Sequence, residues 1–280
     1  MFFGVSMFAT DFAIRPDDLA RLLEDRGFES MWVPEHTHIP ASRRSPWPGG
    51  PDLPEEYWHT YDPFLALTAA AAVTKNLKLG TGICLMVERD PITTAKEVAS
   101  LDMLSDGRFI FGIGGGWNAE EMENHGTTFR RRWRVLRERM LAMKEIWAND
   151  EAEFHGEFVN FDKIRSYPKP VQKPHPPIIM GGDGPRTFDR VIEYCDGWMP
   201  IGGRRPEGPS LGEKITQLRR QAEDAGRDPA SISVSIFGTR PDGDMVNRMK
   251  EAGVDRVVFG LPSANRDTVV PLIDEYAKLM

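Results

Sequence analysis

Eight short apolar segments alternate with helical segments along the chain, and this alternation limits the possible folds more than any other feature. Each segment is rich in β-branched, aromatic or other large apolar residues and is bounded by glycine, proline or polar residues, as is typical of buried strands. The predicted strands are residues 2–8, 30–34, 77–84, 108–113, 177–180, 197–201, 232–237 and 255–259. Apolar residues at helical spacing predict helices at residues 16–27, 62–75, 91–105, 119–124, 130–147, 184–195, 211–226, 242–252 and 267–279.

Strands that alternate with helices form parallel βαβ units, and eight such strands close into a barrel. The alternative is a doubly wound open sheet, in which a glycine-rich fingerprint follows the first strand. Residues 6–9 read Ser-Met-Phe-Ala and hold no such fingerprint. We therefore predict an α/β protein, a single (β/α)8 TIM-barrel domain over residues 1–280.

Two segments do not fit the regular alternation. Residues 39–61 are rich in proline and glycine and are too long for a simple connector, so they are either disordered or a lid over a site. Their aromatic residues Trp47, Tyr57 and Trp58 favour a lid. Residues 149–177 form an irregular insertion before the fifth strand, with a possible hairpin at 153–158 and proline-rich extended chain after it.

Composition and charge exclude several classes of protein. The net charge of −7 argues against nucleic-acid binding, and the basic run at residues 130–134 is interpreted as a solvated helix face. Cys84 and Cys195 lie far apart without a CxxC spacing, which favours a reduced, cytoplasmic protein. Residues 1–8 lack the basic start of a signal peptide, and no apolar run approaches the roughly 20 residues of a membrane span.

The carboxyl ends of the strands meet at one face of such a barrel, where active sites form. This face is rich in glycine and aromatic residues, with no metal-ligand spacing and no Gly-x-Ser-x-Gly elbow, so a bound organic cofactor would supply the chemistry. The glycine run at 114–116 suits either a plain tight turn or the close approach of a flat or anionic ligand. The strand ends collected there are Phe8, Glu35–His36, Gly82–Cys84, Gly114–Asn118, Gly181–Arg186 and Ile201–Gly203.

Two of these strand ends suggest specific roles. Residues 180–187 place glycine amides at the start of a helix, which suits a phosphate group, and Arg186 adds a charged fork; a plain turn would use the same residues. His36 is the one histidine at a strand end, and it follows Glu35. A site role for His36 is supported by the fact that histidine titrates near neutral pH. The alternative is a capping or core role.

Several motifs in order along nearly the whole chain carry a family resemblance. They are Trp32–His36, Tyr61–Phe64, Leu79–Ile83, Leu101–Arg108, Gly114–Glu121, Tyr167–Gln172 and Asp196–Trp198. With these motifs the chain resembles the luciferase-like flavin or deazaflavin oxidoreductases, and more narrowly their coenzyme F-420-dependent branch. The resemblance implies a (β/α)8 barrel that carries FMN or a deazaflavin at the carboxyl ends of its strands.

The resemblance also implies site residues. A non-prolyl cis peptide would lie at Gly82–Ile83 behind the cofactor ring, and Glu35 and His36 would be the catalytic acid–histidine pair beside it. In sugar-phosphate dehydrogenases of the family a glutamate after the fourth strand acts as the acid, but Trp117 occupies that position here and cannot transfer a proton. The expected cofactor-binding residues are Gly82, Ile83, Gly115, Gly116, Trp117, Asn118, Gly181, Gly182, Gly184, Arg186, Ile201 and Gly202.

Three functions follow as hypotheses from the resemblance. The first is hydride transfer between coenzyme F-420 and a small organic substrate, for which the lid suggests an apolar or aromatic compound. The second is an FMN-dependent monooxygenase, which would need a flavin reductase as partner. The third is a non-catalytic flavin-binding protein, against which the lid argues. The family also implies a homodimer.

Overall fold

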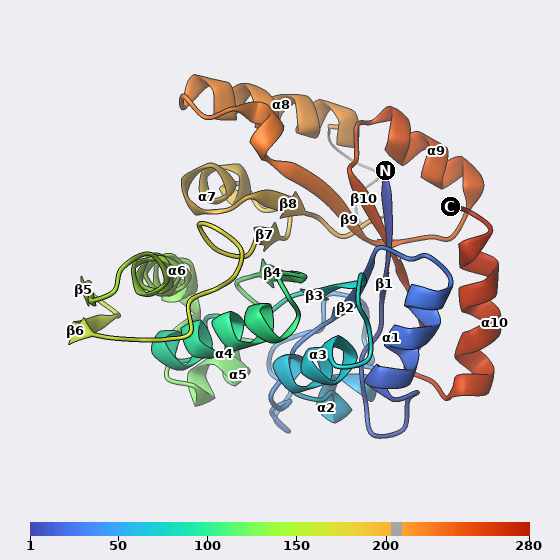
Figure 1. The fold of residues 1–280 in the computed structure, drawn as a ribbon, viewed down its shortest axis with the longest axis horizontal. Helices are drawn as coiled ribbons and strands as arrows, with labels where there is room; N and C mark the ends of the chain where they lie inside the picture. The colour runs from blue at the N-terminus through green and yellow to red at the C-terminus, as the bar shows by residue number, and fades with distance from the viewer. Residues whose placement is uncertain (203–208) are drawn as a thin grey trace.

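The computed structural model describes residues 1–202 and 209–280, and it contains a closed barrel of eight parallel strands (Figure 1). Around the barrel the strand order is β1-β10-β9-β8-β7-β4-β3-β2, so the first and last strands pair and close it. The predicted (β/α)8 barrel is therefore confirmed. Its strands are β1 (Phe2–Ser6), β2 (Ser30–Val33), β3 (Lys78–Thr81), β4 (Phe109–Ile113), β7 (Ile178–Gly181), β8 (Gly197–Met199), β9 (Ser233–Thr239) and β10 (Arg256–Gly260).

Helices connect the strands and surround the barrel (Figure 1). Several begin at a proline that follows a capping aspartate: the Asp62 carboxylate accepts hydrogen bonds from the first-turn amides of one helix, and Asp90 does so for the next. The long helices are α1 (Pro16–Asp25), α3 (Pro63–Ala71), α4 (Pro91–Leu104), α6 (Arg132–Ala148), α7 (Thr187–Tyr194), α8 (Leu211–Asp224), α9 (Gly243–Glu251) and α10 (Arg266–Ala277), and the short ones are α2 (Glu56–His59), α5 (Ala119–Asn124) and two 3-10 turns, η1 (Phe129–Arg131) and η2 (Pro229–Ser231).

Alternate residues of the strands build two separate apolar clusters. One set packs outward against the helices, and the other fills the barrel interior with Trp32, Ile110, Ile179, Met199 and Val258. Trp32 is the largest of the interior side chains and is fully buried. Glycines on both neighbouring strands make room for its ring: a Cβ at Gly80 would lie 2.3 Å from it, and one at Gly4 would lie 3.0 Å from it.

The insertion before β7 contains a hairpin, but not at the predicted residues. Its strands are β5 (Ala152–His155) and β6 (Asn160–Ile164), which pair antiparallel beside α6 (Figure 1). Residues 153–158 contain most of the first strand and the start of the turn. Gly156, between the polar residues His155 and Glu157, ends the first strand earlier than the alternating pattern suggested. The proline-rich chain after the hairpin has no helix or strand, as expected.

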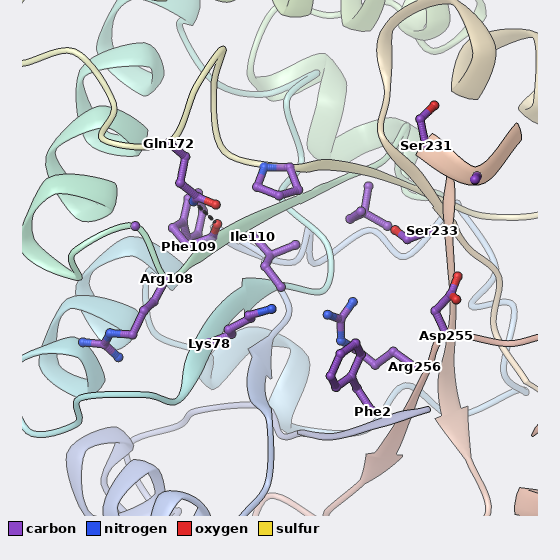
Figure 2. Close-up of a pocket in the computed structure, with 14 residues that line it drawn as sticks. Phe2, Lys78, Arg108, Phe109, Ile110, Gln172, Ser231, Ser233, Asp255 and Arg256 are labelled. Atoms are coloured by element: carbon purple, nitrogen blue, oxygen red, sulfur yellow. Dashed lines mark hydrogen bonds between the residues drawn. The ribbon is translucent and has the colours of Figure 1, made fainter. Parts of the chain in front are cut away.

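A pocket lies at the opposite end of the barrel from the expected site, where the strands begin (Figure 2). Lys78, Arg108 and Arg256 contribute to its wall. Arg256 binds the carboxylate of Glu29 at 2.7 and 2.8 Å, and Lys78 lies 3.2 Å from the same carboxylate. The side chain of Arg108 donates to four backbone carbonyl groups. These cations are therefore satisfied by the protein itself, and this end of the barrel serves stability.

Candidate functional site

The carboxyl end of β3 carries the cis peptide bond that the resemblance implied, between Gly82 and Ile83. The glycines of neighbouring strand ends make room for the side chain of Ile83. A Cβ at Gly114 would lie 2.1 Å from an Ile83 carbon, and a Cβ at Gly181 would lie 2.8 Å from another. The absence of a side chain at these two glycines thus leaves room for Ile83. The sequence analysis considered a tight turn or the close approach of a ligand and did not include this packing reason.

The other glycines of the run have different reasons for being glycine. A Cβ at Gly115 would lie 2.7 Å from the ring of Trp133, so this position admits a large aromatic side chain of α6. Gly116 has a φ of +63°, in the left-handed region that favours glycine. The chain then enters α5, whose first turn is capped by the side chain of Asn118.

His36 forms the central polar contact of the site. Its Nδ1 lies 2.8 Å from Oε2 and 3.0 Å from Oε1 of Glu121, whose side chain is fully buried on α5. Its ring centroid lies 5.1 Å from that of Tyr57 and 5.9 Å from that of Trp117. The Glu121 carboxylate occupies Nδ1, so proton transfer by His36 would use Nε2.

Glu35 is fully engaged by protein groups. One carboxylate oxygen accepts a 2.6 Å hydrogen bond from the amide of Leu85, and the other accepts one of 2.5 Å from Nε of Arg89. Arg89 also binds Asp62 and Glu97, so it joins β2, α3, α4 and the turn after the cis peptide. These contacts give Glu35 a role in positioning the turn, and its predicted catalytic role stays a prediction.

Residues 39–61, named the cover segment here, are bound to α5 through Glu120. The carboxylate of Glu120 accepts hydrogen bonds from the hydroxyl of Ser42 at 2.5 Å, from the amide of Arg44 at 2.7 Å and from the amide of Ser45 at 2.6 Å. Burial acts to raise the pKa of Glu120, but hydrogen bonds from Ser42, Ser45 and the Arg44 amide lower it to about 2. The ionised carboxylate therefore holds the cover segment against the mouth of the barrel.

Aromatic side chains continue from the cover segment to the end of β4. Trp47 donates a 3.0 Å hydrogen bond from Nε1 to the hydroxyl of Tyr57, and the Tyr57 ring lies 6.4 Å from that of Trp117. Phe8, just after β1, also contacts Tyr57, with ring centroids 4.6 Å apart and the rings tilted by 40°. Trp58, by contrast, is exposed and lies outside this group.

The predicted phosphate loop after β7 is only partly available to a ligand. The amide of Gly182 donates to the carbonyl of Met199 at 3.2 Å, and the amide of Gly184 donates to Oγ1 of Thr187 at 2.9 Å. Gly182 has a φ of +101° and open space where a Cβ would stand. Arg186 is exposed and faces Asp189 of its own helix at 3.3 Å.

The last of the strand ends that the sequence predicted to form the site follows β8. Ile201 is exposed and bridges to Phe237 of β9, and the amide of Gly202 donates to the Phe237 carbonyl at 2.7 Å. Gly203 lies outside the described residues.

A model of known luciferase-like monooxygenases matches residues 15–240 of the chain, well over half of its length. The chain belongs to the luciferase-like monooxygenase family. It is 39% identical to an uncharacterised protein of Mycobacterium tuberculosis, over 99% of this chain and 98% of that protein. It is 26% identical to the F-420-dependent hydroxymycolic acid dehydrogenase of the same organism, over 82% of this chain and 60% of that protein.

The solved structures agree on the fold. The monooxygenase RslO1 from Streptomyces bottropensis superposes with a TM-score of 0.80 at 19% identity, covering 100% of this chain and 98% of that one. At this identity the likeness shows the shared barrel of the family. Among residues 1–202 and 209–280, no helix is long and apolar enough to cross a membrane, and no cluster of three or more potential metal ligands occurs.

The sequence analysis missed two side chains that contact the predicted site residues. Glu121 is the partner of His36, although the two residues lie 85 positions apart. The only signal was an acidic first turn after the glycine run, which equally suits a favourable interaction with the helix dipole. Arg89, which holds Glu35, had no recognisable sequence signal at all.

One arginine of the basic run at residues 130–134 departs from the predicted solvated face. Arg131 and Arg134 are exposed and pair with Glu157, as the interpretation of a solvated face requires. Arg132 is half-buried, however, and its Nε has no hydrogen-bond partner among the described residues. It lies near Arg190 of α7, whose guanidinium stacks 3.8 Å from the ring of Trp133. The signal was available: Arg132 stands four residues before the buried Leu136, on the same helix face.

Proposed function

We propose that this protein transfers hydride between coenzyme F-420 and a small organic substrate. The observation that carries the proposal is the buried contact between His36 and Glu121 beside Trp117, at the carboxyl ends of the barrel strands. This pair supplies a proton-transfer group next to aromatic walls. The likeness to an F-420-dependent dehydrogenase of Mycobacterium tuberculosis supports the choice of cofactor.

The residues present fit a flat cofactor with an anionic tail. Arg132 has a buried Nε without a partner among the described residues, and Arg190 lies beside it, so both would bind the tail. The open space at Gly182 adds a backbone position that such a group can approach closely. Gly82, Ile83 and Trp117 would face the ring system. When bound, the deazaflavin accepts or donates hydride at its ring carbon 5.

The protein's own groups would handle the proton and the surroundings. Glu121 fixes the imidazole of His36 through Nδ1 and stabilises its protonated form, so Nε2 exchanges a proton with the substrate oxygen. The cover segment, held by Glu120, keeps water from the mouth of the barrel. With Trp117 in place of a carboxylic acid, sugar-phosphate oxidation is not the expected reaction.

The alternative is an FMN-dependent monooxygenase supplied with reduced flavin by a separate reductase. The observation that favours it is the group of aromatic rings formed by Trp47, Tyr57 and Trp117, because reduced flavin needs dry, apolar surroundings to use oxygen productively. The aromatic lining also suits an apolar or aromatic substrate in either reaction. A homodimer remains part of the proposal, from the family resemblance.

Titrating the purified protein with coenzyme F-420 and with FMN, by fluorescence, separates these functions. We expect saturable binding of F-420, and tight FMN binding without F-420 binding would refute the first proposal. Hydroxylated compounds with F-420, and carbonyl compounds with its reduced form, then test turnover. His36→Ala should lower turnover much more than cofactor affinity, and His155→Ala, an exposed histidine on the hairpin, is the matched control.

A non-catalytic cofactor carrier makes a different prediction. Such a protein would bind one of the two cofactors and show no oxidation or reduction with any substrate offered. In that case His36→Ala would leave every measured rate unchanged.

A further inference from the structure

Two arginines on the neighbouring helices α6 and α7 lack a balancing negative charge (Figure 1). Arg132 and Arg190 are both half-buried, and neither forms an ion pair with a carboxylate of residues 1–202 or 209–280. Burial, and then the charge of Arg190, lower the pKa of Arg132. Two half-buried cations that repel each other with no acid between them call for a physical reason.

Aromatic rings, and not acids, hold the two guanidinium groups in place. Cζ of Arg132 lies 3.7 Å from the centroid of the Phe129 ring, and Cζ of Arg190 lies 3.8 Å from that of Trp133. Stacking covers the face of a planar guanidinium group and leaves the N–H groups at its edge able to donate. Within the described part of the chain, Arg132 donates one hydrogen bond, to the Phe129 carbonyl, and its buried Nε has no partner. The two groups are thus fixed in position with donors to spare.

The place of Arg132 on its helix makes its charge unfavourable by itself. Arg132 is the first residue of α6, which has no acidic residue in its first turn and no capping side chain. The positive end of the helix dipole disfavours a cation at this position. The neighbouring Arg131 and Arg134 are balanced by Glu157, whereas Arg132 is not. A bound anion would remove this conflict.

The loop after β7, which the sequence predicted to bind phosphate, is less suitable than the two arginines. As described above, the amides of Gly182 and Gly184 already donate to protein oxygens. The same loop carries Asp183, whose carboxylate binds Lys214 of α8 at 2.6 Å. This carboxylate repels an approaching anion, so the loop is the weaker of the two candidate sites.

The ring of Trp133 connects the two arginines with the mouth of the barrel. A Cβ at Gly115 would lie 2.7 Å from this ring, so the ring packs directly against the glycine run after β4. Arg190 stacks on the same ring, and the charge of Arg132 acts on Arg190. An anion bound by the two guanidinium groups would therefore lie beside the expected cofactor site.

We propose that Arg132 and Arg190 together bind a phosphate group through their guanidinium N–H donors, in place of the glycine amides of residues 181–184. Phosphate suits the pair because its oxygens accept the paired hydrogen bonds of a guanidinium fork and its charge balances two cations. The source of the phosphate rests on the proposed function and deepens it: the group belongs to the cofactor. Coenzyme F-420 and FMN both carry a phosphate, so the site serves either one.

Thermal unfolding of the cofactor-free protein tests the phosphate site without any assumption about the reaction. Inorganic phosphate should raise the melting temperature of the wild type relative to chloride at equal ionic strength, because it binds only the folded state. This rise should be lost in Arg132→Met and in Arg190→Met, and Arg132→Lys, which keeps the charge without the fork, should retain part of it. Arg134→Met is the matched control: it removes the same charge from an exposed position of α6 and should keep the full rise. A wild type that does not respond to phosphate, or a full response in Arg132→Met, overturns the proposal.

Fluorescence titration identifies the source of the phosphate. FMN is compared with riboflavin, and coenzyme F-420 with its deazaflavin chromophore that lacks the phosphate. Arg132→Met and Arg190→Met should weaken binding of the phosphorylated compounds by roughly 10- to 100-fold and leave binding of the others as in the wild type. Equal weakening of both forms, or none, overturns the assignment to the cofactor. If the wild type binds neither cofactor, the proposed function fails, and the melting temperatures still decide whether the two arginines bind phosphate.

Discussion

The carboxyl group of Glu88, buried in the turn after the cis peptide, makes a quantitative prediction about stability. Its ordinary pKa is 4.5, and burial together with two neighbouring carboxylates raises it to about 9 in the folded protein. Between these values the folded protein holds a proton that the unfolded chain has released. Folding then takes up a proton, so each unit of rising pH lowers the free energy of unfolding by about 1.4 kcal/mol through this group.

Glu88→Gln removes this titration while keeping a side chain of similar size. The contribution of Glu88 to stability is complete below pH 4.5 and is lost progressively as the pH rises toward 9. The free energy of unfolding of Glu88→Gln should therefore rise relative to wild type by about 3 kcal/mol between pH 5.5 and pH 7.5, two units at about 1.4 kcal/mol each. Urea unfolding followed by tryptophan fluorescence, at several pH values in this range, measures the difference.

The matched control is Glu123→Gln, the same change at an exposed position of α5. Its side chain is 50% exposed and pairs with Arg44 at 3.1 Å, a surface contact that contributes less than about 1 kcal/mol. We expect a small difference from wild type that does not grow with pH. A constant difference between Glu88→Gln and wild type over the whole range would refute the reasoning, because it would mean that Glu88 ionises near its ordinary pKa when folded.

Three other substitutions test separate parts of the structure. Glu120→Gln should loosen the cover segment, so amide hydrogen exchange at Arg44 and Ser45 should become faster by roughly 10- to 100-fold. Unchanged exchange rates would show that the carboxylate does not hold the segment. Arg89→Met leaves three carboxylates without their cation and should lower the free energy of unfolding by about 3–5 kcal/mol, measured by urea unfolding. In Gly112→Ala the new Cβ would lie 2.0 Å from the backbone carbonyl oxygen of Thr81 in the neighbouring strand β3. The soluble yield and the melting temperature should therefore fall sharply. A melting temperature like that of the wild type would refute this packing.

The fold was predictable because local patterns repeat around the barrel. Apolar runs ended by glycine, and helices begun by Asp62–Pro63 or Asp90–Pro91, identify eight strand–helix units without knowledge of any contact. Boundaries were less certain. The strand predicted to end at residue 84 ends at Thr81, since the cis peptide follows and leaves Cys84 as an isolated bridge to Ile113.

The site was predictable only where a single strand end carries the signal. His36 and Trp117 follow their strands directly, and the structure brings their rings within 5.9 Å. Glu121 was not predictable as the partner of His36, because the contact depends on how α5 is oriented after the glycine run. Arg132 was misread because the charge of the Arg-rich run concealed the one position that shares a face with buried Leu136.

The glycine run matters most through the helix that follows it. The six-residue α5 is too short to be stable by itself, so contacts on its sides must hold it. Its consecutive residues Glu120 and Glu121 point in directions about 100° apart on the helix, and one binds the cover segment while the other binds His36. The position of the cover and the orientation of the imidazole therefore depend on one small element. We therefore expect Glu120→Gln to weaken the contact between Glu121 and His36 as well, because both contacts depend on the position of α5.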